Sequence, residues 1–172
     1  PNETIQITLK SPNLLLEDEI KLNIYFTVDD EVDLNRMGML VWKSQPEHVD
    51  ISTADHVITG ATYDAALGYY GVVTDGIPAQ TLGDLVYFCI YIEMLAGSYV
   101  YSRQVSYSTS TYEYNRIKGD ASPASKALYV AILNYGAAAQ YYLDYKVEAL
   151  INADLTDAQR ALVDAYTPDM TQ

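Results

Sequence analysis

The chain has 172 residues, with 23 acidic and 10 basic side chains and a formal net charge of −13. An apolar fraction of 49% excludes an intrinsically disordered chain, and the length allows a buried core without metals or disulfides. Because this negative charge would repel phosphate backbones, we expect no nucleic-acid partner. The longest apolar run, residues 85–92, is too short for membrane insertion.

The first two thirds of the chain has the apolar periodicity of β-strands. Residues 4–9 alternate, with Ile5, Ile7 and Leu9 on one face, which is the pattern of a half-buried strand. Residues 93–99 are typical of a hairpin connection between two long strands. The predicted strands cover residues 4–9, 20–26, 37–43, 56–58, 69–74, 84–94 and 98–107. Short strands at this spacing, without helices between them, predict an antiparallel β-sandwich.

After residue 108 the apolar period changes to that of helices. Ser122 places a capping hydroxyl directly before Pro123, which suits the first position of a helix. Thr156 and Gln159 have capping-box spacing and predict a last short helix that ends before Pro168. The longer helix carries an apolar stripe that we expect to pack on the sandwich: Leu128, Ala131, Ile132, Tyr135, Ala138, Ala139 and Tyr142.

The domain organisation follows from these two periodicities. A further short helix is predicted over residues 112–118. Because the helical tail is too small to hold a core alone, we expect one structural unit that is mainly β with a helical C-terminus. The predicted parts are a β-sandwich over residues 1–108 and a helical extension over residues 109–172, packed on the sandwich.

One helical segment is distinctive, Asn134-Tyr135-Gly136-Ala137-Ala138-Ala139-Gln140, which is followed by Asn152-Ala153-Asp154-Leu155-Thr156. Leu40-Val41-Trp42, Gly60-Ala61-Thr62-Tyr63 and Gly97-Ser98-Tyr99-Val100-Tyr101 precede it. With these pieces the chain resembles a module of large secreted and cell-surface proteins of Gram-positive gut bacteria. The resemblance implies an Ig-like sandwich with C-terminal helices and an extracellular location. It supplies no catalytic residue.

Tyrosine is unusually frequent, at 17 residues, and it combines apolar area with a hydroxyl group that suits sugars or protein partners. Tyr99, Tyr101 and Tyr107 share one parity and predict an aromatic ladder on one face of a strand. The side chains that could form a ligand-binding surface are Trp42, Tyr69, Tyr70, Tyr99 and Tyr101. The alternative is that these rings are buried in the fold.

Acidic residues suggest a second kind of site. Asp29, Glu31 and Asp33 could offer oxygen ligands to Ca²⁺ in an irregular loop between strands. An EF-hand is excluded, because a loop starting at Glu31 would place Arg36 where glycine is needed. The alternative reading is a solvated acidic loop. Cys89, the only cysteine, lies in an apolar run and is expected to be a buried hydrophobic residue.

No nucleophile elbow of the form Gly-x-Ser-x-Gly and no phosphate-binding Gly-Lys-Ser/Thr loop occurs, so we expect no enzyme and no cofactor. The sequence predicts a non-catalytic structural or interaction module, a spacer or scaffold at a cell or particle surface. Its partners would be other modules or proteins of that assembly. The alternative is a carbohydrate-binding module that uses surface Trp and Tyr side chains, with calcium at the acidic loop.

Overall fold

The computed structural model describes residues 5–166, and the chain divides into two compact units. The first comprises Pro1–Ile77 and Leu85–Tyr107, and the second comprises Pro78–Asp84 and Ser108–Gln172. Thr4, where the first strand was predicted to start, and Pro168, expected to follow the last helix, lie outside the described residues.

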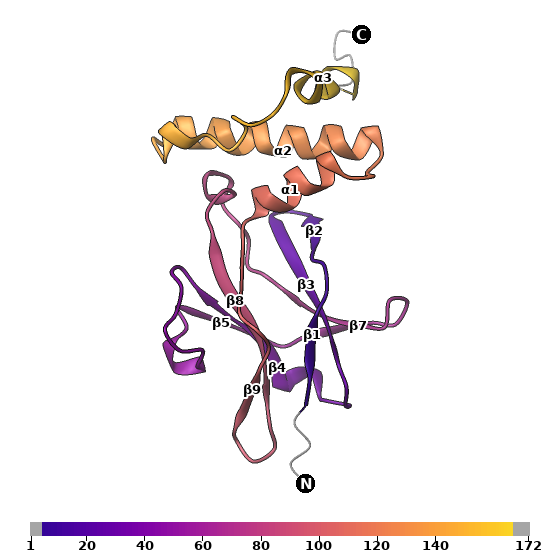
Figure 1. Cartoon of the computed structure of the whole chain (residues 1–172), viewed down its shortest axis with the longest axis vertical. Coiled ribbons are helices and arrows are strands. Elements are labelled where there is room, and N and C mark those ends of the chain that lie inside the picture. The colour runs from indigo at the N-terminus through magenta and orange to yellow at the C-terminus, as the bar shows by residue number, and fades with distance from the viewer. Residues whose placement is uncertain (1–4, 167–172) are drawn as a thin grey trace. The chain divides into compact units, whose positions relative to one another are not determined.

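The first unit contains two antiparallel sheets (Figure 1). One has the order β1-β3-β7-β6 with β2 also paired to β3, and its strands are β1 (Ile7–Leu9), β2 (Asn13–Leu16), β3 (Ile20–Val28), β6 (Thr62–Asp64) and β7 (Tyr69–Val73). The other has the order β10-β8-β4-β5 with β9 also paired to β8, and its strands are β4 (Met37–Trp42), β5 (His56–Thr59), β8 (Val86–Glu93), β9 (Tyr99–Tyr101) and β10 (Val105–Tyr107). The predicted antiparallel, sandwich-like β fold is confirmed, as is the hairpin between β8 and β9.

A single apolar core joins the two sheets. Phe26 and Val72 contribute from the first sheet, and Met39 and Ile90 from the second. In each strand these residues alternate with side chains on the outer face, as the two-residue period requires.

The centre of the second sheet is buried on both faces. Met37, Met39, Phe88, Ile90 and Ile92 face the shared core. Leu40, Trp42, Cys89 and Tyr91 form a second cluster on the outer face. Val49, Ile51 and Ala54, on the segment between β4 and β5, pack against this outer cluster. Burial on both sides explains why β4 and β8 read as continuous apolar runs in the sequence rather than as alternating ones.

The predicted aromatic ladder of Tyr99, Tyr101 and Tyr107 is wrong. Tyr99 and Tyr101 pack on the outer cluster, whereas Tyr107 packs against the core between the sheets. Between β9 and β10 the backbone pairing with β8 is interrupted. There the Ser102 hydroxyl accepts a hydrogen bond from the Ile90 amide at 2.9 Å. Because these inserted residues shift the register, Tyr107 emerges on the opposite face.

Gly38 in β4 creates the space that the outer cluster needs. A Cβ at this position would overlap the carbonyl oxygen of Ile58 and lie 2.6 Å from the ring of Tyr91. We therefore expect Gly38→Ala to destabilise the first unit by about 3 kcal/mol, as overpacking against backbone does. Urea denaturation followed by the fluorescence of Trp42 measures this loss. Ser106→Ala, an exposed change in the same sheet, should leave the midpoint in place, and equal midpoints for the two variants would contradict the prediction.

The second unit contains three α-helices among the described residues: α1 (Thr109–Lys118), α2 (Pro123–Tyr142) and α3 (Asp157–Tyr166). Ser122 caps α2 by accepting from the Ser125 amide, and Pro123 opens the helix as predicted. The capping box is confirmed in both directions, between the Thr156 hydroxyl and the Gln159 amide and between the Gln159 side chain and the Thr156 amide. No helix within residues 5–166 is both long and apolar enough to span a membrane.

The predicted apolar stripe of α2 coincides with its buried face only in part. Ile132 is buried as predicted, whereas Leu128, Tyr135 and Tyr142 are exposed. The other residues that the helix buries are Ala127, Val130, Leu133, Gly136, Ala137 and Gln140. Both sets recur at helical spacing, so periodicity alone did not separate them. The buried set includes a glutamine and a glycine, which a search for apolar periodicity does not select.

The distinctive helical segment of the sequence has a structural role in this unit. The side chain of Gln140 is 2% exposed, and it accepts from the Ile151 amide at 2.9 Å and donates to the Ala149 carbonyl at 3.1 Å. Asn134 accepts from the side chain of Asn152 at 3.0 Å. A Cβ on Gly136 would collide with Ile151, so the glycine leaves room for that side chain. The segment thus holds residues 149–152 against α2.

Candidate functional site

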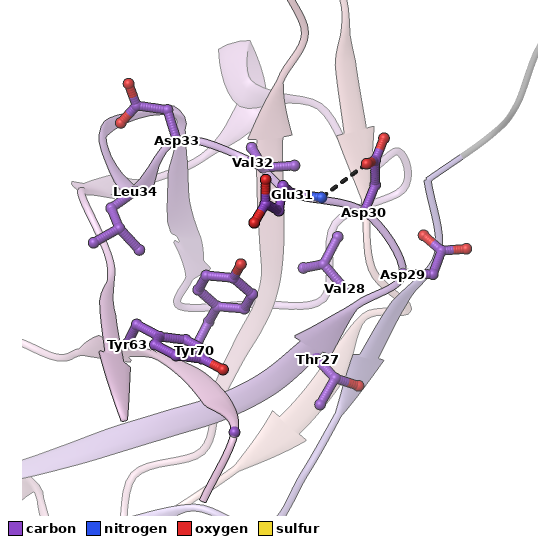
Figure 2. Close-up of a pocket in the computed structure, with 11 residues that line it drawn as sticks. Thr27, Val28, Asp29, Asp30, Glu31, Val32, Asp33, Leu34, Tyr63 and Tyr70 are labelled. Atoms are coloured by element: carbon purple, nitrogen blue, oxygen red, sulfur yellow. Dashed lines mark hydrogen bonds between the residues drawn. The ribbon is translucent and has the colours of Figure 1, made fainter. Parts of the chain in front are cut away.

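A hollow of about 1050 Å³ in the first unit is the strongest candidate for a site (Figure 2). It lies between the segment that follows β3 and the β6–β7 hairpin, and it is open to solvent. Its lining contains four carboxylates and no basic side chain: Thr27, Val28, Asp29, Asp30, Glu31, Val32, Asp33, Leu34, Tyr63, Gly68 and Tyr70.

The aromatic side of this hollow is a row of rings across three strands. Phe26, Tyr70 and Tyr63 are cross-strand partners on β3, β7 and β6, so their side chains share the inner face of the first sheet. Phe26 is fully buried, Tyr70 is half-buried against the core and Tyr63 is 53% exposed. The row therefore runs from the core to solvent, and Tyr63 and Tyr70 form the wall where the sheet emerges.

The acidic side of the hollow is the loop at residues 29–33. One oxygen of Asp29 accepts from the Gln6 amide at 2.7 Å, and one oxygen of Asp33 accepts from the Asn35 amide at 2.9 Å. In the view of Figure 2 the carboxylates of Asp29 and Asp33 point away from the tyrosine rings, and Glu31 is drawn above the rings. Among the described residues no three His, Cys, Asp or Glu side chains gather closely enough to hold a metal ion. The structure thus brings Asp29, Glu31 and Asp33 to one loop without pointing them at a common centre.

Trp42, Tyr99 and Tyr101 lie elsewhere, in the outer cluster of the second sheet. Trp42 is 3% exposed and donates its indole N–H to the hydroxyl of Thr53 at 3.2 Å. Tyr99 and Tyr101 are half-buried with nearly parallel rings, 6.2 Å between centroids. The hydroxyl of Tyr101 accepts from the Ile51 amide at 3.0 Å, and burial raises its pKa. These rings hold the segment between β4 and β5 on the sheet.

Tyr69 is separated from Tyr70 because neighbouring residues in a strand point to opposite faces. Its ring packs on Tyr25 at 5.9 Å between centroids, and the ammonium group of Lys10 lies 5.7 Å from the ring centre. Of the five predicted aromatic site residues, only Tyr70 lines the hollow.

Tyr63 is the site residue that the sequence reasoning missed. A signal for it was present in the turn between Asp64 and Gly68. Asp64 accepts from the amides of Ala66 and Leu67, and Gly68 has a φ of 70°, which favours glycine. Counting outward from this turn pairs Tyr63 with Tyr70 across the hairpin.

Cys89 offers no reactive thiol. It is buried in the outer cluster as predicted, and burial raises the pKa of its thiol to about 12. At neutral pH it is therefore protonated and behaves as a small apolar side chain.

Comparisons of the chain with family models, with curated proteins and with solved structures found no match.

Proposed function

We propose that this chain is a non-catalytic Ig-like module that acts as a structural or interaction unit in an extracellular surface assembly. The kind of assembly is the one that the sequence resembles, the large surface proteins of Gram-positive gut bacteria. The partners are other modules or proteins of that assembly.

The main support for the proposal is the position of the aromatic side chains of the second sheet. A surface on which sugars stack needs exposed aromatic rings. Trp42, Tyr99 and Tyr101 instead close the outer face of the second sheet over the segment at residues 49–54. Their apolar area stabilises the sandwich, which suits a scaffold.

A carbohydrate-binding module is the second candidate, and the hollow of Figure 2 favours it. Tyr63 and Tyr70 are partly exposed beside carboxylates that can accept hydrogen bonds from sugar hydroxyls. In this alternative, Ca²⁺ at Asp29, Glu31 and Asp33 would neutralise the acidic loop.

A glycan array probed with the whole chain, once with Ca²⁺ and once with EDTA, tests the proposal. We expect no specific signal in either condition. A specific signal that is lost in Tyr63→Ala would overturn the structural role and support the carbohydrate-binding module. Tyr135→Ala, a change to an exposed tyrosine of the other unit, serves as the matched control.

A further inference from the structure

Helix α2 carries a second apolar stripe, on the side opposite its buried face. Leu128, Tyr135 and Tyr142 belong to it and are 47%, 62% and 89% exposed. With 3.6 residues per turn, Tyr142 lies on the side opposite the fully buried Leu133. The outer stripe of α2 alternates steps of four and three residues, the spacing of a coiled-coil seam, and it consists of Ala124, Leu128, Ala131, Tyr135, Ala138 and Tyr142.

The composition of α2 is that of a helix covered on both sides. Lys126 is the only charged residue between Pro123 and Tyr142. A surface helix usually has charged residues on its solvent side, whereas a helix that is apolar all round is typically buried. The described part of the chain buries one side of α2 and leaves the outer stripe in solvent. A contiguous exposed apolar stripe of this kind marks a protein contact surface.

The outer stripe is complementary to itself, because large and small side chains alternate along it. When two copies of α2 are placed antiparallel with residue 133 of one level with residue 133 of the other, every large side chain faces an alanine. The facing pairs are Leu128 with Ala138, Tyr135 with Ala131, and Tyr142 with Ala124. A parallel pair in register would instead oppose large to large and leave gaps between the alanines. Interdigitation of large with small residues is what close helix packing requires.

The outer stripe has the area and the charge that a weak dimer requires. Its three large side chains leave roughly 400 Å² exposed in each copy, taking about 200 Å² for a whole tyrosine. With the side chains that flank the stripe, a pair of helices would bury roughly 1,000 Å² in total, the size of a weak interface. No acidic side chain occurs from residue 121 to residue 143, so α2 brings no carboxylate to the contact in a chain of net charge −13.

We propose that α2 of one copy packs antiparallel on α2 of a second copy through the outer stripe, which gives a dimer with two-fold symmetry. Each copy contributes the same surface, as in most closed homodimers. The inference gives the interaction role proposed above one specific partner, a second copy of this chain, and its test is independent of the glycan array.

Sedimentation equilibrium of the whole chain measures the association. We expect a reversible equilibrium between the mass of 19.2 kDa and twice that mass, with a Kd of about 10–100 µM. Samples from about 10 to about 300 µM cover this range.

Three variants assign the association to the outer stripe. Ala138→Glu should weaken it at least about 10-fold, because the dimer would bury two unpaired carboxylates. Ala138→Leu should weaken it about 5-fold although it adds apolar surface, since the new side chain takes the space of Leu128 from the other copy. Ala158→Glu adds the same charge at an exposed alanine of α3 and should dimerise like the unchanged chain. Both alanines are exposed, so the core is untouched, and ellipticity at 222 nm confirms the fold.

An equimolar mixture of Leu128→Cys and Ala138→Cys chains tests the antiparallel register. The two positions face each other in the proposed pair, within reach of a disulfide. Two copies of residue 128 lie ten residues apart along the helices, about 15 Å, and the same holds for residue 138. The mixed disulfide should therefore form at least about 5-fold faster than either symmetric one. Cys89 is buried and does not compete.

A chain that stays monomeric at the highest concentration would overturn the inference. So would association that Ala138→Glu leaves unchanged, or symmetric disulfides that form as fast as the mixed one. Each of these results would leave the structural role standing, because that role fails only on a specific glycan signal.

Discussion

A Gln140→Met variant is expected to lose about 3 kcal/mol of unfolding free energy in the helical unit. Methionine matches the volume of glutamine but makes no hydrogen bond to the Ile151 amide or the Ala149 carbonyl. Both bonds are part-buried, and a backbone group that loses its partner away from water costs about 1–3 kcal/mol. Urea denaturation followed by ellipticity at 222 nm, where the helices dominate, measures the loss.

The neighbouring Tyr141 provides the matched control. It is 74% exposed on the same turn of α2, and Tyr141→Ala should leave the denaturation midpoint nearly unchanged. If Gln140→Met were as stable as Tyr141→Ala, the bonds from Gln140 to residues 149–151 would not hold that segment. Trp42 fluorescence, recorded in the same samples, reports on the sandwich separately.

The stability of the helical unit is expected to fall as pH rises from about 5 to 8, because of Glu113 on α1. This side chain is fully buried, and neither carboxylate oxygen has a hydrogen-bond partner. Burial raises its pKa from 4.5 to about 8. Between these values the folded chain keeps a proton that the unfolded chain releases, so the unfolding free energy decreases by up to about 4 kcal/mol across the window.

Glu113→Gln tests this expectation directly, because glutamine has nearly the same shape and does not titrate. The variant should show a flat stability profile over the same pH range and should exceed the unchanged chain at pH 8. Glu148→Gln, a change to an exposed glutamate, should keep the slope of the unchanged chain. A profile for the unchanged chain that is flat from pH 5 to 8 would show that Glu113 is not held protonated.

The parts of the fold that the sequence predicted well are those governed by local rules. The alternation in β3, the proline and serine at the start of α2 and the capping box of α3 each require particular residues at fixed spacing. The failures arose where tertiary structure decides. The interruption at Ser102 reversed the face of Tyr107. The buried side of α2 combines the apolar residues Val130 and Leu133 with Gln140 and Gly136, whose contacts a search for apolar residues does not find.

The candidate site was half visible in the sequence. Four of its residues were selected, but as members of two separate sites: Tyr70 in an aromatic site, and Asp29, Glu31 and Asp33 in an acidic one. Their meeting at one hollow depends on how the loop after β3 folds back beside the β6–β7 hairpin, and no spacing along the chain encodes that approach. Trp42 shows the opposite error, since residue type suggested a surface ligand contact and the fold buries it.

The helical unit takes one of its segments, Pro78–Asp84, from between β7 and β8 of the sandwich. Within that segment Leu82 is fully buried, and Asp84 accepts from the hydroxyl of Tyr145 and from the ammonium of Lys146. A recombination event with a single crossover after residue 107 would replace the helices but keep Pro78–Asp84. That segment would then lack the residues that it contacts in this chain. The two units are expected to be inherited together, so gene shuffling would exchange this module whole.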